Sequence, residues 1–139
     1  MKTPTSEEKT REKICHIIMV DDESDVNVTI KTALEENGDF QVDTFNDAES
    51  AISGFKPGHY DLAILDIKMP GTNGFQLCRK LREIDKKLKI CFLTAVESTY
   101  LDDIDSVVIN DLKTDCFVSK PVNTTDLISR LDVILSHSE

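Results

Sequence analysis

Positive charge and long apolar runs are both scarce in this sequence. Its 139 residues contain 16 lysines and arginines against 26 aspartates and glutamates, which gives a formal net charge of -10 at pH 7. A chain this acidic repels phosphate groups, so we expect no direct binding of nucleic acid and no attachment to an anionic membrane surface. No apolar run approaches the roughly 18 residues of a membrane-spanning helix. The polar segment 1–13 also lacks the apolar centre of a signal peptide, which favours a cytoplasmic location.

Cysteine and histidine are present but do not form the motifs of a metal site. The four cysteines stand at positions 15, 78, 91 and 116 without a C-x-x-C pair, and the three histidines are scattered. Three of the cysteines fall inside apolar segments that look like strands. We therefore expect reduced thiols in a core rather than metal ligands or disulfides.

The length fits one domain, in which two kinds of segment alternate. Short apolar segments, typical of buried strands, are followed by segments whose apolar residues recur at helical spacing. Strands are expected at 14–20, 40–45, 60–65, 88–93 and 115–119. Helices are expected after the possible N-caps Ser24 and Asp47, through Leu77–Ile84, at 99–110, and through Leu127–Leu135. This order predicts an α/β fold, a doubly wound parallel sheet formed by residues 14–139 after a polar arm at 1–13.

Reactive side chains stand at the carboxyl ends of four expected strands. Asp21 and Asp22 follow the first strand, Asp66 the third, Thr94 the fourth and Lys120 the fifth. Ligands of open parallel sheets bind beyond these strand ends, so the five side chains should converge on one edge. Each one alone is more often a turn residue, a helix cap or a solvated charge. Their joint placement is what indicates a site.

The chemistry of these residues suits phosphoryl transfer. Three crowded carboxylates repel one another and need a cation, and an all-oxygen site with room for water suits Mg2+. The metal, the Lys120 ammonium and the Thr94 hydroxyl could neutralise charge on a moving phosphoryl group. The carboxylate on the central strand, Asp66, would be the nucleophile that forms an acyl phosphate.

Four stretches carry a resemblance to a known family. They are Val20–Glu23 (VDDE), Leu65–Gly71 (LDIKMPG) with Gly74, Leu93–Ala95 (LTA) and Val118–Pro121 (VSKP). With them the chain resembles, over about residues 14–137, the receiver domain of bacterial and archaeal response regulators. The resemblance implies a flavodoxin-like (βα)5 fold with strand order 2-1-3-4-5. It also implies a phosphoacceptor of a two-component phosphorelay with Mg2+ as cofactor.

The same resemblance gives the carboxylates separate roles. Asp66 looks like the phosphoacceptor. Asp22 looks like a direct Mg2+ ligand, together with Asp66 and the backbone carbonyl of Lys68. Asp21 would act on the metal through a bound water.

The resemblance also implies a switch. Thr94 and Lys120 would bind phosphoryl oxygens, and the Lys120–Pro121 peptide would be cis, which is tolerable before proline. Phe117 stands where the family keeps its switch aromatic. That residue is often tyrosine, and phenylalanine has no hydroxyl to hold the inward position.

Phosphorylation would change a surface made by the elements expected at 99–110, 115–119 and Leu127–Leu135, called here the output surface. The implied partners are a histidine kinase or phosphotransfer protein, a downstream effector protein, and a second copy of the chain bound through this surface. Residues Lys68 and Val96 flank the path of the hydrolytic water and would tune the phosphate lifetime. The protein would be no enzyme beyond its own phosphorylation and dephosphorylation.

Three alternatives remain open from the residues. A phosphatase of the haloacid dehalogenase type would want Asp-x-Asp and a cap domain, whereas this chain has Asp21-Asp22. A degenerate receiver, binding partners without phosphorylation, should have lost one of the five site residues. A flavin-binding fold would need a phosphate loop rich in Gly, Ser or Thr after the first strand. Kinase, stimulus and output are not named by the sequence, nor is it settled whether an effector domain follows residue 139.

Overall fold

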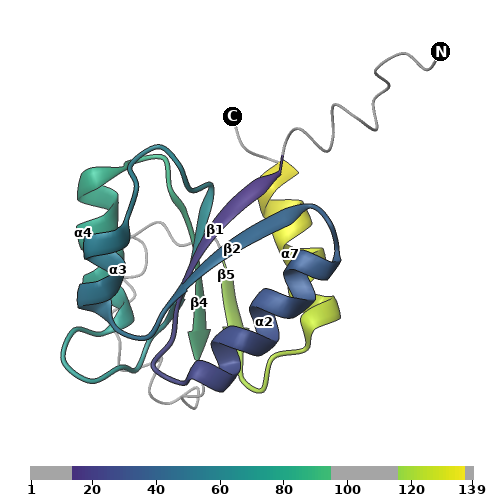
Figure 1. The fold of residues 1–139 in the computed structure, drawn as a ribbon, viewed down its shortest axis with the longest axis horizontal. Coiled ribbons are helices and arrows are strands. Elements are labelled where there is room, and N and C mark those ends of the chain that lie inside the picture. Colours follow the sequence, from purple (N-terminus) through teal and green to yellow (C-terminus); the bar gives the residue numbers. More distant parts are fainter. Residues whose placement is uncertain (1–13, 95–115, 137–139) are drawn as a thin grey trace.

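The computed structural model describes residues 14–94 and 116–136, in which one sheet lies between two layers of helices (Figure 1). The strands are β1 (Cys15–Val20), β2 (Phe40–Phe45), β3 (Leu62–Asp66), β4 (Lys89–Thr94) and β5 (Cys116–Ser119). The helices are α2 (Ser24–Glu36), α3 (Ala48–Gly54), α4 (Gly74–Ile84) and α7 (Thr124–Ser136). All neighbouring strands are parallel in the order β2-β1-β3-β4-β5, which confirms the predicted topology. The helix expected at 99–110 lies outside the described residues.

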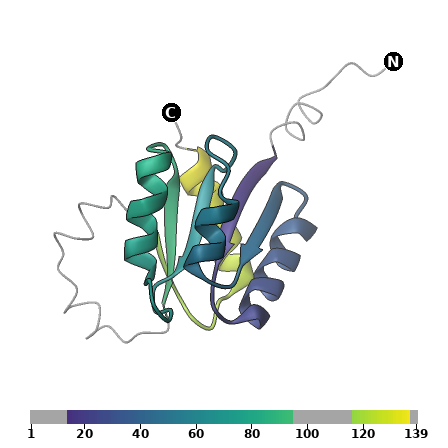
Figure 2. The same ribbon diagram turned by 60° about the vertical axis from the view of Figure 1, so that its left-hand side comes forward.

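Helices on both faces explain why the central strands are apolar along most of their length. Successive residues of a strand point to opposite faces of the sheet. In β1, Ile18 and Val20 join the core beneath α3 and α4, while Ile17 and Met19 join the core beneath α2 and α7. Figure 2 shows the helices on either side of the sheet. A strand covered on both sides needs apolar residues throughout.

The outer edge of β2 is closed by side chains of α2. Val42 donates its backbone N–H to Glu35 Oε2 at 2.9 Å, and Lys31 Nζ donates to the carbonyl oxygen of Val42 at 2.7 Å. Lys31 and Glu35 also pair with each other at 2.8 Å. These bonds satisfy the backbone N–H and C=O of Val42, which could otherwise pair with a strand of another molecule.

One of the two expected helix caps is present. The side chain of Asp47 accepts from the backbone N–H of Ser50 at 2.7 Å, as predicted. The prediction for Ser24 is wrong, because α2 begins at Ser24 and its N-cap is Glu23, which makes no side-chain capping bond. The Glu23 side chain is instead paired with Lys120, 3.1 Å away. The side chain at the N-cap position therefore makes a long-range ion pair and leaves the backbone N–H groups of the first turn of α2 without a side-chain cap.

The cysteines differ in part from the expected free thiols. Cys15 and Cys78 carry thiols that are not part of a disulfide, but Cys91 is disulfide-bonded. In the β4–β5 ladder the backbone of Cys91 stands opposite that of Cys116. The prediction of reduced thiols is wrong for Cys91, so the cysteines do not support the expected cytosolic location.

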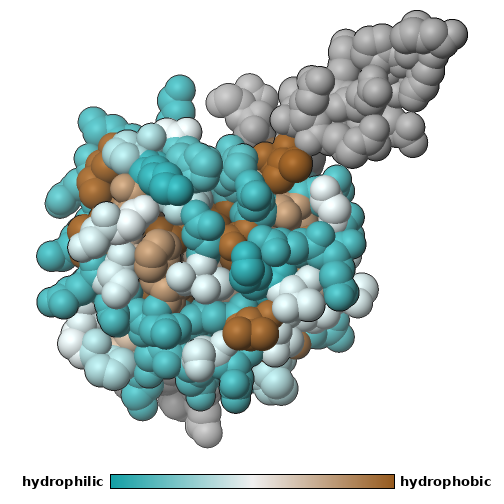
Figure 3. Space-filling view, viewed as in Figure 1, coloured by the Kyte–Doolittle hydropathy of each residue, from teal (hydrophilic) through white to brown (hydrophobic). Residues whose placement is uncertain are grey.

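The face shown in Figure 3 is mainly hydrophilic, with small and separate hydrophobic patches. The large apolar side chains that are exposed are Ile14, Val28, Ile84 and Val133. Within 14–94 and 116–136, no helix has the length and apolar character needed to cross a membrane.

Gly74 allows α4 to start against the end of β3. A Cβ built on Gly74 would collide with the carbonyl oxygen of Asp66 and stand 2.9 Å from Cα of Ile67. The N–H of Gly74 donates to the carbonyl of Ile67 at 2.9 Å. Only glycine permits this close approach. The helix therefore holds the backbone on either side of the peptide bond that follows Asp66.

We expect Gly74→Ala to destabilise the protein by about 1–3 kcal/mol, because backbone atoms rather than flexible side chains must move. Urea unfolding measures the loss. Lys80→Ala, an exposed change on the same helix, should stay within about 0.5 kcal/mol of the parent. Equal stability of both variants would contradict the close packing.

Candidate functional site

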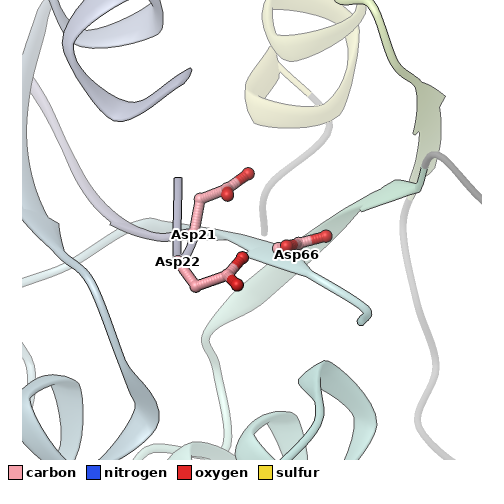
Figure 4. Close-up of side chains that lie close together, drawn as sticks. All are labelled: Asp21, Asp22 and Asp66. Atoms are coloured by element: carbon pink, nitrogen blue, oxygen red, sulfur yellow. The ribbon is translucent and has the colours of Figure 1, made fainter. Parts of the chain in front are cut away.

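Three carboxylates meet at the carboxyl edge of the sheet (Figure 4). One oxygen each from Asp21, Asp22 and Asp66 lies within 4.8 Å of the other two. Asp21 and Asp22 follow β1, and Asp66 ends β3, which pairs directly with β1. Figure 4 shows the Asp21 and Asp22 side chains extending toward the side on which Asp66 lies. The convergence predicted from the strand ends is confirmed for these residues.

Lys120 brings a positive charge into the carboxylate group. Its Nζ lies 2.9 Å from Asp21 Oδ2, 3.1 Å from Glu23 Oε1 and 3.5 Å from Asp66 Oδ2. The Lys120–Pro121 peptide is cis, as expected. The sequence alone did not indicate that Glu23 is a partner of Lys120. The two residues are 97 positions apart, and one more glutamate in an acidic sequence does not indicate which lysine it contacts.

Thr94 is placed beside this lysine by the sheet. It ends β4, is 5% exposed, and stands opposite Ser119 of β5. The carbonyl oxygen of Thr94 accepts from the backbone N–H of Lys120 at 2.9 Å. Backbone bonding at the end of the ladder therefore holds the threonine and the lysine of the predicted set together.

The three carboxylates of the site carry more negative charge than the one ammonium group of Lys120 can neutralise. Burial raises the pKa of Asp66 to about 7, and the negative charge of Asp21 and a hydrogen bond that the protonated Asp66 donates to Asp22 act in the same direction, against the opposing charge of Lys120. Burial alone would lower the pKa of Lys120, but hydrogen bonds to Asp21 and Glu23 and the nearby carboxylates outweigh it, so that pKa lies above its usual range. The lysine thus remains charged, while Asp66 is only partly ionised near neutral pH.

The residues present fit a divalent cation. All the side-chain donors of the triad are oxygens, and Asp22 is exposed beside the buried Asp21 and Asp66. Oδ2 of Asp21 is buried, and the Lys120 ammonium lies 2.9 Å from it, so the buried carboxylate is already paired with a positive charge. A hard cation that takes oxygen ligands and keeps several waters matches this set.

Two of the remaining predicted residues are described, and one is not. Phe117 is partly buried, and its ring stacks on Phe92 with centroids 5.5 Å apart. Phe92 in turn meets Phe75 edge-on at 4.8 Å, so an aromatic row crosses the sheet toward α4. The Lys68 side chain is exposed. Val96 lies outside the described residues.

Comparison with known proteins assigns this arrangement to a family. A model described as the response regulator receiver domain matches residues 17–132. The chain belongs to this family. It is therefore a receiver domain of two-component response regulators, which sets aside the phosphatase and flavin-binding alternatives.

Curated relatives resemble this receiver domain along part of their length. The transcriptional regulatory protein PcoR of Escherichia coli is 32% identical over 119 residues, which cover 86% of this chain and 50% of that protein. The alkaline phosphatase synthesis regulator PhoP of Bacillus subtilis is 30% identical over 123 residues, covering 88% and 49%. The chain thus spans about half the length of the curated relatives it matches.

Solved receiver structures share the fold. A CheY-like receiver domain protein of Methanospirillum hungatei has a TM-score of 0.76 at 26% identity, covering 90% of this chain and 96% of its own. TrrA of Thermotoga maritima, in complex with Mg2+-BeF, has a TM-score of 0.72 at 35% identity, covering 87% and 99%.

We expect Asp66→Asn to stabilise the metal-free protein more at pH 8 than at pH 5. The folded-state pKa of about 7 exceeds the value of about 3.9 in an unfolded chain, so Asp66 binds its proton more tightly when folded. Stability from this proton is complete below about pH 4 and is lost as the pH rises toward 7. A neutral asparagine avoids the loss, which is at most about 4 kcal/mol.

Urea unfolding in EDTA at both pH values measures this difference. Asp25→Asn, which removes an exposed charge, is the control and should show little pH dependence relative to the parent. Adding Mg2+ should shrink the advantage of Asp66→Asn. An advantage that does not change with pH would contradict the raised pKa.

Proposed function

We propose that this receiver accepts a phosphoryl group on Asp66 from a histidine kinase or a phosphotransfer protein, in a reaction that depends on Mg2+. The observation that carries the proposal is the meeting of the Asp66 carboxylate with two further carboxylates and with Lys120 Nζ, 3.5 Å away. The Mg2+-BeF complex of TrrA, at 35% identity, supports the same metal here.

An oxygen of Asp66 attacks the phosphorus of the donor, and the donor leaves as the acyl phosphate forms. Asp22, Asp66 and the carbonyl of Lys68 would hold the Mg2+, with Asp21 acting through a water. When bound, the ion neutralises the carboxylates and the oxygens of the moving phosphoryl group. Asp66 must lose its proton to attack. Lys120 then exchanges part of its contact with the carboxylates for a phosphoryl oxygen.

A groove beside Lys120 supplies a docking place for the phosphodonor protein. It encloses about 510 Å3 between the start of α2 and the segment that leads into α7. Its lining residues are Glu23, Asp25, Val26, Thr29, Ile30, Lys120, Pro121 and Val122. The apolar members form a surface that a helix of a partner would cover, and Lys120 connects that surface with Asp66. A phosphohistidine on such a helix would approach the acceptor from this side.

Phosphorylation then switches the output surface. We propose that Thr94 moves toward the phosphoryl group and that Phe117, now stacked on Phe92, moves into the space released. The altered surface would bind a downstream effector protein or a second copy of the chain. A cytoplasmic location, without direct contact to nucleic acid or membrane, is part of the same proposal.

With Mg2+ and acetyl phosphate, the protein should gain one acid-labile phosphate that hydroxylamine removes. Asp66→Ala should abolish the gain because no other carboxylate takes the same position. Intact-mass measurement is the readout, since the chain has no tryptophan. Asp25→Ala, an exposed change in the groove, should still be labelled. Full labelling of Asp66→Ala would refute the assignment.

We expect the phosphate on Asp66 to be lost slowly. Val96 has no group that orients a water, and Lys68 would shield the phosphoryl group. Measured by mass in the presence of Mg2+, the variant Val96→Glu with Lys68→Asn should lose phosphate several-fold faster than the parent. The single variant Lys68→Asn separates the two contributions. An unchanged rate of phosphate loss in the double variant would contradict this expectation.

A further inference from the structure

Asn27 is a polar residue on the buried side of α2. It is 2% exposed, and Ile30 and Leu34, which follow on the same side of the helix, are fully buried. A buried amide is tolerated only when it is hydrogen-bonded. The groups that it contacts therefore indicate why it is present.

The Asn27 amide nitrogen connects the site with a neighbouring loop. Its Nδ2 lies 2.9 Å from the carbonyl oxygen of Asp21, 3.2 Å from that of Phe45 and 2.9 Å from Oδ1 of Asn46. Main-chain carbonyls only accept hydrogen bonds, so these contacts fix which way the amide points. The segment after β1 and the segment after β2 are thereby tied to one side chain.

The other end of the same amide is not satisfied. Oδ1 of Asn27 is buried and has no hydrogen-bond partner among the residues that the structure describes. An apolar side chain of similar size would avoid this desolvation cost. The buried oxygen is therefore a cost, and the contacts of the nitrogen are the feature that explains asparagine at this position.

The bond to Asp21 acts on the peptide that joins two carboxylates of the site. The carbonyl of Asp21 and the N–H of Asp22 belong to one planar unit. Holding that carbonyl fixes the plane, and with it the direction in which Asp22 leaves the chain. The Asp21 side chain is held separately, since its Oδ1 accepts from the N–H of Glu23 at 2.8 Å and its Oδ2 faces Lys120. The hydrogen bond from Asn27 thus restrains the peptide that precedes Asp22, the exposed member of the triad.

We propose that Asn27 is a positioning residue that sets the affinity of the site for its divalent cation, by locking the Asp21–Asp22 peptide against the loop after β2. The inference rests on the proposed function in that Mg2+ is the cation. Partners behind metal ligands typically change metal affinity by 10- to 100-fold. Because Asn46 shares the amide nitrogen, the loop after β2 also influences the carboxylates.

Mg2+ titration of the unphosphorylated protein by calorimetry tests the proposal, with thermal unfolding in EDTA measured in parallel. Asn27→Leu keeps the volume and removes the donor, so it should bind Mg2+ about tenfold more weakly. It should also unfold at a somewhat lower temperature, because the buried carbonyl of Asp21 loses a hydrogen-bond donor. Asn46→Ala, an exposed change that leaves the core intact, should weaken Mg2+ binding by a smaller factor. Asn37→Ala, at the other end of α2, should bind like the parent.

Each outcome decides the matter. Parental Mg2+ affinity in Asn27→Leu, with or without a lower unfolding temperature, would make the residue purely structural and overturn the proposal. If Asn27→Leu does not fold, parental affinity in Asn46→Ala overturns it. A parent that binds no Mg2+ overturns both this inference and the proposed cofactor, whereas parental affinity in the variants alone leaves the proposed function standing.

Discussion

The repulsion among three carboxylates at one end of a sheet is the constraint on which the rest of this site depends. One oxygen of each carboxylate lies within 4.8 Å of the others, and two of the three side chains are buried. Lys120 offsets part of that charge, and burial together with the neighbouring carboxylates raises the pKa of Asp66 to about 7, so that a fraction of the molecules keeps a proton on Asp66 near neutral pH. A divalent cation would remove the need for that proton. The same crowding of carboxylates is the feature on which the proposed binding of a metal and a phosphoryl group rests.

The scaffold around the carboxylates is rigid for identifiable reasons. β1 and β3 are neighbours and fully covered, so the two strand ends that carry Asp21 and Asp66 have little freedom. Gly74 admits α4 against the backbone that follows Asp66, and the Thr94 carbonyl holds Lys120 from the neighbouring strand. Main-chain contacts rather than side-chain contacts thus set most of the arrangement. Precise placement of this kind lowers the reorganisation that a phosphoryl transfer would require.

Two structural features of the described residues relate the site to possible partners, a groove and a row of packed aromatic rings. The groove between α2 and the start of α7 opens next to Lys120 and is the proposed docking place of the phosphodonor protein. The aromatic row of Phe117, Phe92 and Phe75 runs the other way and supplies a packed connection for a conformational change. The chain spans about half the length of the curated relatives it matches, so what such a change would control lies with the partners proposed above.

The sequence by itself determined the order of the described strands and helices and the five residues at the strand ends. It could do so because the buried part of a strand such as β1 is a continuous apolar run, and because Asp21, Asp22, Asp66, Thr94 and Lys120 each end a strand or follow it within two residues. Those signals are local. Prediction failed or was silent where distant segments meet.

Ser24 was expected to cap α2, but the N-cap is Glu23, whose side chain pairs with Lys120. The disulfide at Cys91 and the three contacts of the Asn27 amide also became visible only in the folded chain. Each of these depends on which atoms the packed sheet brings within about 3 Å, and no spacing along the chain encodes that distance. Tertiary structure alone decided them, because a polar side chain takes its partner from its neighbours in space.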